Sequence, residues 1–451
     1  MKRLINYYLN EWKNNPDRLP LLVRGARGVG KTFAVRELGN KFTNFLEINL
    51  ESDGQKLKDL FKEDLDPVRI IRNLSIRYKT EIVPGNTLLF FDEIQEEPQA
   101  IIALRYFYEK MPDLHVIAAG SLLDFAIEEV GLPVGRVEAL HMYPMSFLEF
   151  LIASNYSLAA KEIFLHDPMQ PLSLSTHNLL LGILKEYIAV GGMPKVVDFW
   201  LKNNAIQCRK MQATIIDTYK QDFGEYAKKR QVKYLAEIFK HAPLQLGGKF
   251  KFSKIGEYRK RELEPCLNLL EMARVINKVI YSAGQGVPIG SQSDINDFKL
   301  IFLDVGLAQS ILGLDISEWL MASEQAFVNQ GSIVEAFVGQ ELLAYADPGT
   351  RAQLYYWHRD TRGSEAEIDY LVQLKNQIVP IEVKSGAGRT LKSMSLFLDS
   401  HLNSPYGVKF STNNFSVFEK IQTYPLYAIT KKLIEASGEK DSLYLAVMSL
   451  L

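Results

Sequence analysis

Hydrophobic residues in the first third of the chain fall into short continuous runs separated by polar turns and a helical pattern. LPLLVRG (19–25), NTLLFFDEIQ (86–95) and HVIAAGS (115–121) each contain such a run. Runs of this kind are typical of parallel strands that are buried on both faces. Because a helical pattern follows the first run, we expect an α/β fold in this part of the chain.

The middle of the chain is predicted to be mainly helical. LLLGILKEYIAV (179–190) has a helical pattern, and the GGMP that follows Val190 contains the usual helix stop signals. Further on we expect a helix in VKYLAEIFKHA (232–242), a short helix in SKIGEYRKR (253–261), a helix in ELEPCLNLLEMARVI (262–276) and a strand in NKVIYS (277–282).

The last third of the chain mixes strands with helices. KLIFLDVGLAQSILG (299–313) predicts a strand and a helix, with which we expect a new folding unit to begin. GSIVEAFVGQELLAYA (331–346) has apolar residues at helical spacing. The remaining segments predict three strands and a helix: LYYWHRD (354–360), EIDYLVQL (367–374), IVPIEVKSG (378–386) and LKSMSLFLDS (391–400).

Length and composition limit the class of protein. The chain has 451 residues, and single hydrophobic cores stop growing at about 250–300 residues, so we expect several domains. With 52 Lys and Arg against 53 Asp and Glu, a nucleic-acid partner would have to bind a local patch. Cys208 and Cys266 are too few for a disulfide framework or a four-cysteine zinc site.

Membrane association is not expected. Residues 1–18 carry charges where a signal peptide needs an apolar centre, and no stretch of about 18 uncharged apolar residues follows. We expect a cytoplasmic protein with no membrane partner.

A nucleotide-binding motif follows the first hydrophobic run. Gly25 opens the pattern Gly-x4-Gly-Lys-Thr, in which backbone N–H groups surround phosphate oxygens, Lys31 reaches the terminal phosphates and Thr32 offers its hydroxyl to Mg²⁺. The alternative is a glycine-rich turn between a strand and a helix. The predicted nucleotide-binding residues are Gly25, Ala26, Arg27, Gly28, Val29, Gly30, Lys31, Thr32 and Phe33.

Two further runs end in side chains that suit ATP hydrolysis. Asp92 closes the second run and is placed to hold hydrated Mg²⁺, while Glu93 is placed to polarise the attacking water. After the phosphate loop, this pair decides against the glycine-rich turn and predicts a Mg²⁺-dependent ATPase. Ser121 closes the third run, where it can sense the terminal phosphate or simply end the strand.

GRVEALHMYPMSFLEFL (135–151) resembles the segment after the sensor strand in one prokaryotic branch of the AAA+ group of P-loop ATPases. The resemblance implies that Arg136 senses or stabilises the transferred phosphate, in its own subunit or in a neighbouring one of a homo-oligomer. A surface ion pair is the alternative for this arginine. The chain departs from the pattern at Ala26 and Arg27, and at Ser121 in place of the more usual asparagine.

The order of elements between residues 231 and 282 resembles a winged helix-turn-helix, which the same family places here. A third helix that reads DNA should carry basic or amide side chains. This one carries Glu262, Glu264 and Glu271, and the basic residues 259–261 lie just before it. Because phosphates repel carboxylates, a structural or regulatory winged helix is as consistent with the sequence as a DNA reader.

Asp369, Glu382 and Lys384 form the pattern Asp-x12-Glu-x-Lys on two predicted neighbouring strands. Two carboxylates suit Mg²⁺ or Mn²⁺, and a lysine beside them can orient a water for attack on a phosphodiester. The pattern resembles the PD-(D/E)xK nuclease superfamily, in which Glu335 matches an acidic residue that the preceding helix contributes.

These four residues have structural alternatives. Ser332 and Glu335 have the spacing of a helix capping box. Asp369 and Glu382 can instead form cross-strand ion pairs with Lys384 or Arg359.

The resemblance covers nearly the whole chain and implies an α/β protein with four parts: a P-loop AAA+ ATPase core (1–175), a helical lid or linker (176–228), a winged-helix domain (229–288) and a restriction-endonuclease-like PD-(D/E)xK domain (289–451). We expect a Mg²⁺-dependent ATPase that couples hydrolysis of ATP to a nuclease-like domain with its own Mg²⁺ or Mn²⁺ and a DNA or RNA partner. The alternative is a nucleotide-controlled switch whose nuclease-like domain binds a protein or nucleic acid without cleaving it.

Overall fold

A computed structural model describes residues 1–451 except 58, 63, 322–329, 362–363, 387–390 and 439–440. The chain forms two compact units. Residues 2–143 and 347–351 make up the ATPase unit, named for the motifs it carries, and residues 144–346 and 352–451 make up the C-terminal unit. Among the described residues, no helix is long and apolar enough to cross a membrane.

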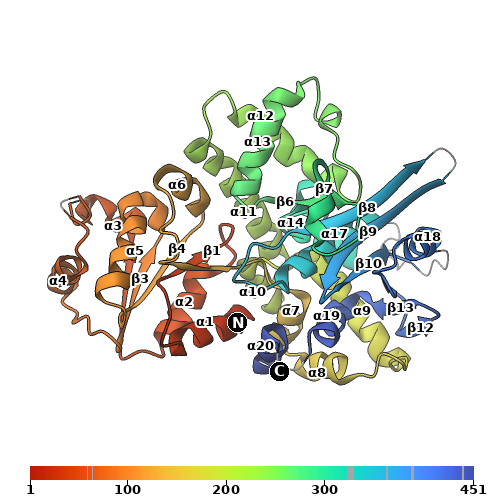
Figure 1. Cartoon of the computed structure of the whole chain (residues 1–451), viewed down its shortest axis with the longest axis horizontal. Helices are drawn as coiled ribbons and strands as arrows, with labels where there is room; N and C mark the ends of the chain where they lie inside the picture. Colours follow the sequence, from red (N-terminus) through yellow and green to blue (C-terminus); the bar gives the residue numbers. More distant parts are fainter. Residues whose placement is uncertain (58, 63, 322–329, 362–363, 387–390, 439–440) are drawn as a thin grey trace. The chain divides into compact units, whose positions relative to one another are not determined.

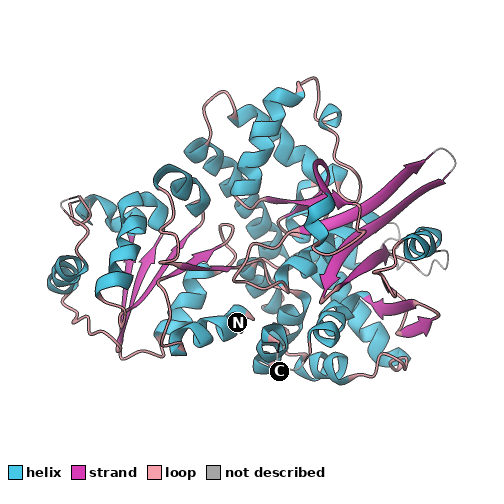
Figure 2. Cartoon of the chain, in the orientation of Figure 1, coloured by secondary structure: helices cyan, strands magenta, loops and turns pink. Residues whose placement is uncertain are grey.

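The ATPase unit is built on a five-stranded sheet with the order β2-β3-β4-β1-β5, in which neighbouring strands are parallel (Figure 1). Helices lie on both sides of this sheet (Figure 2). The strands are β1 (Leu21–Arg24), β2 (Asn44–Asn49), β3 (Thr87–Asp92), β4 (His115–Gly120) and β5 (Glu138–His141), and the helices are α1 (Ile5–Asn14), α2 (Lys31–Gly39), α3 (Leu50–Leu57), α4 (Pro67–Tyr78), α5 (Pro98–Lys110) and α6 (Leu123–Val130).

The central strands of this sheet are buried along their whole length, as the hydrophobic runs predict. Every residue of β3 and β4 is buried. Leu89 and Phe91 share one buried cluster with Ile101 and Leu104 of α5, and the alternate residues of β3 face the other side of the sheet. The three strands expected from the first third of the sequence are therefore confirmed.

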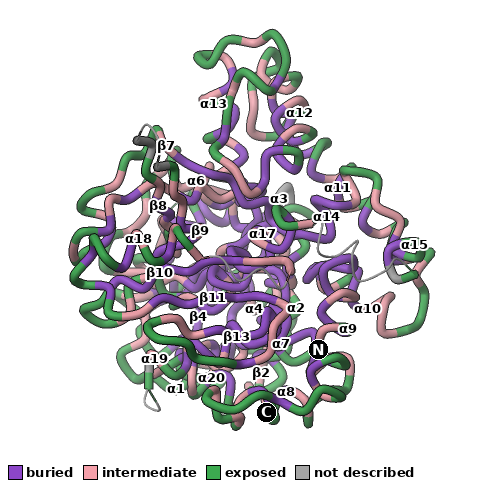
Figure 3. The backbone as a smooth tube through the Cα atoms, turned by 90° about the vertical axis from the view of Figure 1, so that its right-hand side faces the viewer, coloured by how far each residue is buried: buried purple, intermediate pink, exposed green. Residues whose placement is uncertain are grey.

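The C-terminal unit contains a mixed eight-stranded sheet with the order β12-β13-β11-β10-β9-β8-β6-β7. The neighbouring strands β10 and β11 are buried over most of their length (Figure 3). The strands are β6 (Ile276–Ser282), β7 (Ser293–Phe302), β8 (Leu354–Thr361), β9 (Ser364–Leu374), β10 (Gln377–Lys384), β11 (Gly407–Ser411), β12 (Ser416–Phe418) and β13 (Ile421–Pro425).

Helices precede, interrupt and follow this sheet along the chain. Their bounds are α7 (Phe147–Ala153), α8 (Ser157–Leu165), α9 (Leu174–Val190), α10 (Pro194–Leu201), α11 (Ala205–Tyr226), α12 (Val232–His241), α13 (Lys260–Met272), α14 (Val305–Ile311), α15 (Ile316–Met321), α17 (Gly331–Ala344), α18 (Lys392–Ser400), α19 (Ile429–Ser437) and α20 (Ser442–Leu450). As predicted, α9 ends at Val190, and Gly191 continues the chain with a φ of 79° that glycine adopts without strain.

The prediction of a short helix at 253–261 is wrong. A 3-10 turn, Phe252–Lys254, lies at the start of this segment, and its last two residues are already the first two of α13. Gly256 interrupts the segment with a φ of 84°, and the Glu262 carboxylate accepts the backbone N–H of Arg259 at 3.0 Å. This bond fixes the start of α13 at Lys260, so the basic residues 260 and 261 belong to the helix.

Strand β6 pairs with β7 on one side and with β8 on the other, so β6 and β7 are part of the C-terminal sheet. The predicted boundary between residues 288 and 289 thus falls between two paired strands. The mixed α/β class with a parallel sheet is confirmed, whereas the winged-helix and restriction-endonuclease-like assignments and the four-part division stay predictions.

Candidate functional site

The nucleotide-site candidates lie at the carboxyl edge of the five-stranded sheet. Arg24, the last residue of β1, lies opposite Gly120, the last residue of β4. The loop that starts at Gly25 therefore leaves the sheet beside Ser121. Gly28 and Gly30 have φ values of 81° and 101°, a region that glycine adopts without strain. Carboxyl ends of parallel strands are the usual ligand edge of an α/β sheet.

The loop is closely held within the ATPase unit. Lys31 is buried, and its Nζ donates to the carbonyls of Gly25 at 2.9 Å and Ala26 at 3.0 Å. Arg3 donates to the carbonyl of Val29 at 2.9 Å, a contact that sequence patterns do not reveal. Of the other predicted loop residues, Phe33 is half exposed, Arg27 is partly buried, and Ala26 and Val29 are buried.

Thr32 and Asp92 lie in direct contact. The Thr32 hydroxyl donates to the two Asp92 oxygens at 3.0 and 3.3 Å. A hydroxyl and a carboxylate side by side are hard oxygen donors of the kind that Mg²⁺ takes, so these residues fit that ion. Burial, followed by the charge of Glu93, raises the pKa of Asp92 to about 6.

Glu93 lies next to Ser121. Its Oε2 accepts the Gln95 side-chain amide at 2.8 Å and the Ser121 hydroxyl at 3.5 Å. The backbone of Glu93 has a φ of 50°, so the chain turns sharply as it leaves β3. Gln95, which sequence reasoning missed, orients the carboxylate; its position two residues after Glu93, in the turn that follows the strand, was the available signal.

Arg136 is not brought into contact with the phosphate loop. Its Nε lies 3.2 Å from Glu109 Oε1, and its guanidinium lies over the Tyr108 ring at 5.7 Å. Within one chain these contacts are those of the surface ion pair.

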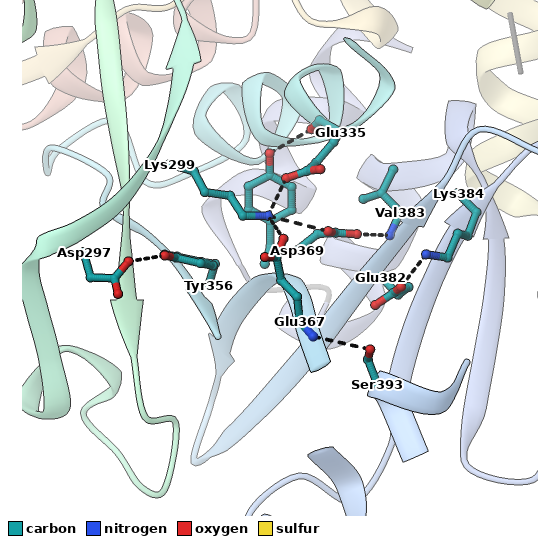
Figure 4. A network of polar contacts seen from close by, with 11 residues as sticks. Asp297, Lys299, Glu335, Tyr356, Glu367, Asp369, Glu382, Val383, Lys384 and Ser393 are labelled. Carbon is teal, nitrogen blue, oxygen red and sulfur yellow. Dashed lines mark hydrogen bonds and ion pairs between the residues drawn. The ribbon is translucent and has the colours of Figure 1, made fainter. Parts of the chain in front are cut away.

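A second polar cluster lies in the C-terminal unit and centres on Lys299 of β7 (Figure 4). Its Nζ lies 2.8 Å from Glu335 Oε1 and 3.7 Å from Asp369 Oδ1, and it also pairs with Glu367. The Lys299 side chain is only 2% exposed. We call Lys299, Glu335, Glu367 and Asp369 the lysine-centred cluster.

Glu382 and Lys384 lie beside this cluster but pair with each other (Figure 4). Lys384 Nζ is 2.5 Å from Glu382 Oε1, whereas Glu382 Oε2 is buried without a hydrogen-bond partner among the described residues. Asp369 accepts the backbone N–H of Val383 at 2.7 Å, which ties β9 to β10. The structure thus brings the four predicted residues of this site into one region, where Glu335 and Asp369 pair with Lys299 and Glu382 pairs with Lys384.

Burial dominates the electrostatics of this region. It raises the pKa of Glu335, Asp369 and Glu382, and for Glu335 and Glu382 the charge of Asp369 adds to the effect. Burial also acts to lower the pKa of Lys299, but the three carboxylates outweigh it and raise that pKa, so the lysine stays charged.

The capping-box alternative for Glu335 is wrong. Helix α17 begins at Gly331 without a side-chain cap, and the Glu335 carboxylate reaches Lys299 instead. Glu382 does form an ion pair with Lys384, but within β10 and not across two strands as the ion-pair alternative expected.

Sequence reasoning missed Glu367 and Lys299. Glu367 lies two residues before Asp369, a spacing that puts both side chains on one face of a strand, and this signal was available. Lys299 opens the apolar run KLIFL and could have been noted as a charge within a buried strand. Glu367 also lines a polar cleft of about 300 Å³ with Lys249, Tyr356, His358, Glu365 and Ser393.

Family models match three parts of the chain. Residues 17–151 match the AAA domain, residues 182–318 match a domain of unknown function (DUF8612), and residues 330–429 match another domain of unknown function (DUF4143). The first third of the chain is thus a P-loop, AAA-like ATPase domain. The match of the last part does not bear on nuclease activity.

Solved structures give more distant similarities. The chain is similar to the Walker-type ATPase PABY2304 of Pyrococcus abyssi, with 16% identity and a TM-score of 0.43 over 69% of this chain and 95% of that chain. It is also similar to PCH-2 of C. elegans, with 12% identity and a TM-score of 0.24 over 40% of this chain and 56% of that chain. No curated protein matches the chain.

Proposed function

We propose that this protein is a Mg²⁺-dependent ATP hydrolase. The observation that carries the proposal is the Thr32–Asp92 contact beside the Glu93–Ser121 pair, both at the sheet edge where the phosphate loop begins. Thr32 and Asp92 hold Mg²⁺, which neutralises phosphate charge when it is bound. Lys31 binds the terminal phosphates, Glu93 polarises the attacking water, and Ser121 senses the terminal phosphate.

The test compares ATP hydrolysis and ATP binding in two glutamate variants. In Glu93→Gln we expect ATP binding to be kept and hydrolysis to fall by about 10²–10⁴-fold, because an amide cannot accept a proton from water. Glu96→Gln is the matched control: its side chain is exposed on the same turn, and its hydrolysis rate should equal that of the parent. A Glu93→Gln protein that hydrolyses ATP at the parent rate would exclude Glu93 as the base.

We further propose that hydrolysis is coupled through a helical lid (176–228) and a winged helix (229–288) to a nuclease-like domain (289–451) associated with DNA or RNA. Support comes from a basic segment, residues 228–261, in which the acidic residues are Glu237 and Glu257. Its exposed basic residues are Lys228, Lys229, Arg230, Lys233, Lys240, Lys249, Lys251, Lys254, Arg259, Lys260 and Arg261. Such a segment is the local patch that a chain of balanced net charge needs for phosphates.

Aromatic side chains are interleaved with this basic segment. Tyr234 and Tyr258 contact each other with ring centroids 5.3 Å apart, and Lys233 lies over the Tyr234 ring at 4.7 Å. Lys260 lies over the Phe252 ring at 5.7 Å. Rings and cations together suit single-stranded nucleic acid, whose bases stack on aromatic side chains.

A salt titration of nucleic-acid affinity tests this part of the proposal. Phosphate contacts make the logarithm of affinity fall with the logarithm of salt concentration. The double variant Arg259→Gln/Lys260→Gln should bind more weakly and lower the slope by about 0.7–0.9 for each phosphate that the protein no longer neutralises. Lys195→Gln/Lys202→Gln, on and just after α10, is the control. A flat response in the parent protein would point to a protein partner.

A second candidate function is a nucleotide-controlled switch whose C-terminal domain binds without cleaving. The lysine-centred cluster favours it, because a lysine lies where the metal of a nuclease would be expected. Cleavage assays on DNA and RNA with Mg²⁺ or Mn²⁺, with and without ATP, separate the two candidates. Cleavage that Lys384→Ala abolishes would assign the nuclease function, with a second metal at Asp369, Glu382 and Glu335.

A further inference from the structure

We propose that Lys299 is a built-in cation that takes the place of a divalent metal ion in the lysine-centred cluster. The C-terminal domain then keeps its acidic side chains together without binding a metal there. This inference rests on the second proposed function, a nuclease-like domain that binds without cleaving, and it explains how such a domain stays folded.

The first argument is the match between the ammonium group and its partners. Lysine has three N–H donors, and three carboxylates surround this one: Glu335 at 2.8 Å, Asp369 at 3.7 Å and Glu367 in close contact. The four residues come from three elements, since Glu335 lies on α17, Glu367 and Asp369 lie on β9, and the lysine lies on β7 (Figure 4). The lysine therefore joins elements that are far apart in the sequence.

The second argument is the geometry of the carboxylates. One oxygen from each of Glu335, Glu367 and Asp369 lies within 4.8 Å of the others, a spacing that could hold a metal ion. Mg²⁺ and Ca²⁺ bind such oxygens at about 2.0–2.6 Å. The Lys299 ammonium already contacts all three carboxylates, and two positive charges repel each other at such distances. A metal ion can enter only if the lysine leaves.

The third argument is that Lys299 is held in place. Its side chain is 2% exposed, and its Nζ lies over the Tyr356 ring at 5.2 Å. The Tyr356 hydroxyl in turn donates to Asp297 on the same strand as Lys299. Moving this buried lysine aside would be costly in free energy, because the carboxylates would stay behind as buried charges without a partner.

The fourth argument concerns the predicted metal ligands. Glu335 and Asp369 pair with Lys299, whereas Glu382 pairs with Lys384 at 2.5 Å. Each of the three already has a lysine partner, so the set does not fit a divalent ion as it stands. Glu367 is the most exposed member of the cluster, at 43%, and lines the polar cleft. The cleft therefore borders the cluster at Glu367.

Manganese binding to the nucleotide-free protein tests the proposal. The experiment uses the full chain with Asp92→Asn, so that Mn²⁺ does not bind at the ATPase site, and it follows free Mn²⁺ by its electron paramagnetic resonance signal. We expect no saturable site in this parent. Adding Lys299→Met should create one site per chain, with affinity at least tenfold above the parent, and adding Glu367→Gln to that variant should abolish it.

Lys249→Met is the matched control, because this lysine lines the same cleft but pairs with Asp297 instead of the cluster. It should bind no more Mn²⁺ than the parent. A parent that binds one Mn²⁺, and loses it with Glu367→Gln alone, would overturn the proposal. A folded Lys299→Met protein that gains no site would contradict it as well.

A failure to fold is separated from a failure of the proposal. If Lys299→Met does not fold, the parent itself still decides, since one bound Mn²⁺ that Glu367→Gln removes would overturn the proposal; this changed side chain is partly exposed. The coupled ATPase function is measured separately, in proteins with Asp92 intact. If these proteins do not bind nucleic acid, that result counts against the proposed function and leaves the Mn²⁺ result unaffected.

Discussion

At the scale of single residues, Glu341 shows how a buried carboxyl can set the pH dependence of stability. It is 1% exposed, and its Oε1 accepts the backbone N–H of Phe147 at 2.9 Å. Burial raises the pKa of Glu341 from 4.5 to about 8. The folded protein therefore keeps a proton here that the unfolded chain has released at neutral pH.

The sign of the effect follows from this difference. The stability that the protonated group contributes is complete below pH 4.5 and is lost as the pH rises through 8. Relative to Glu341→Gln, the free energy of unfolding of the parent should fall by about 1.4 kcal/mol per pH unit across this interval. Urea denaturation between pH 5.5 and 8.5 measures it, with exposed Glu318→Gln as the control. Equal slopes for parent and Glu341→Gln would show that the folded carboxyl is ionised.

Sequence patterns predict single residues well where a motif has a fixed local geometry. Thr32 and Asp92 could be assigned together because both stand at the carboxyl edge of one parallel sheet. Lys299 could not, since its partners come from α17 and β9, and no periodicity relates positions 299, 335 and 369. Only the folded backbone shows that a lysine lies among these carboxylates.

At the scale of elements, Asp304 joins the GGMP turn after α9 to the first turn of α14 in the C-terminal unit. Its carboxylate accepts the backbone N–H of Gly192, in the GGMP turn, at 2.6 Å and that of Leu307, in the first turn of α14, at 2.9 Å. A Cβ on Gly191 would lie 2.1 Å from Asp304 Oδ1, so the glycine allows the carboxylate to approach. The turn and the carboxylate therefore require each other.

Removing this carboxylate should lower the free energy of unfolding by more than removing an ordinary helix cap does. Asp304→Ala leaves buried N–H groups without a partner and removes the cap of α14, so we expect a loss of about 2–4 kcal/mol in the free energy of unfolding. Asp315→Ala removes the partly exposed cap that accepts Ser317 N–H and should cost about 1 kcal/mol. Denaturation curves of both variants measure the difference, and equal losses would mean that burial adds nothing to this cap.

Elements themselves were predictable where hydrophobic spacing was regular. The helices in the 179–190 and 331–346 segments and the strands around β8, β9 and β10 follow directly from periodicity. The short helix at 253–261 was wrong because Gly256 and the Glu262 cap outweigh a helical pattern. The parallel pairing of β6 with β8 could not be predicted from the sequence either. Val279 and Leu354 are paired although they lie far apart in the chain, and hydrophobic spacing does not show which strands become neighbours.

At the scale of the whole molecule, two compact units carry the two candidate sites, so that each site can be tested by itself. The P-loop, Asp92, Glu93 and Ser121 belong to the ATPase unit, and the lysine-centred cluster belongs to the C-terminal unit. Arg136 also belongs to the ATPase unit but contacts Glu109 and Tyr108. If it acts on phosphate, a neighbouring copy of the chain is the place for it.

This role for Arg136 predicts that hydrolysis needs assembly. The ATPase rate per chain should rise with protein concentration, and Arg136→Ala should lower it by about 10³-fold or more while ATP still binds, since an arginine supplied in trans has effects of that size. Arg105→Ala is the matched control, because Arg105 pairs with the same Glu109 at 2.9 Å. Its rate should stay near that of the parent.

Mixing two inactive variants decides between neighbours and a single chain. In a mixture of Arg136→Ala and Glu93→Gln, a subunit with an intact Glu93 can receive an intact Arg136 from its neighbour, so hydrolysis should return. An arginine that serves its own chain would leave the mixture inactive, because each subunit would lack one required group. If the Arg136→Ala protein hydrolyses ATP at the parent rate, Arg136 has no role in hydrolysis and forms only the surface ion pair with Glu109.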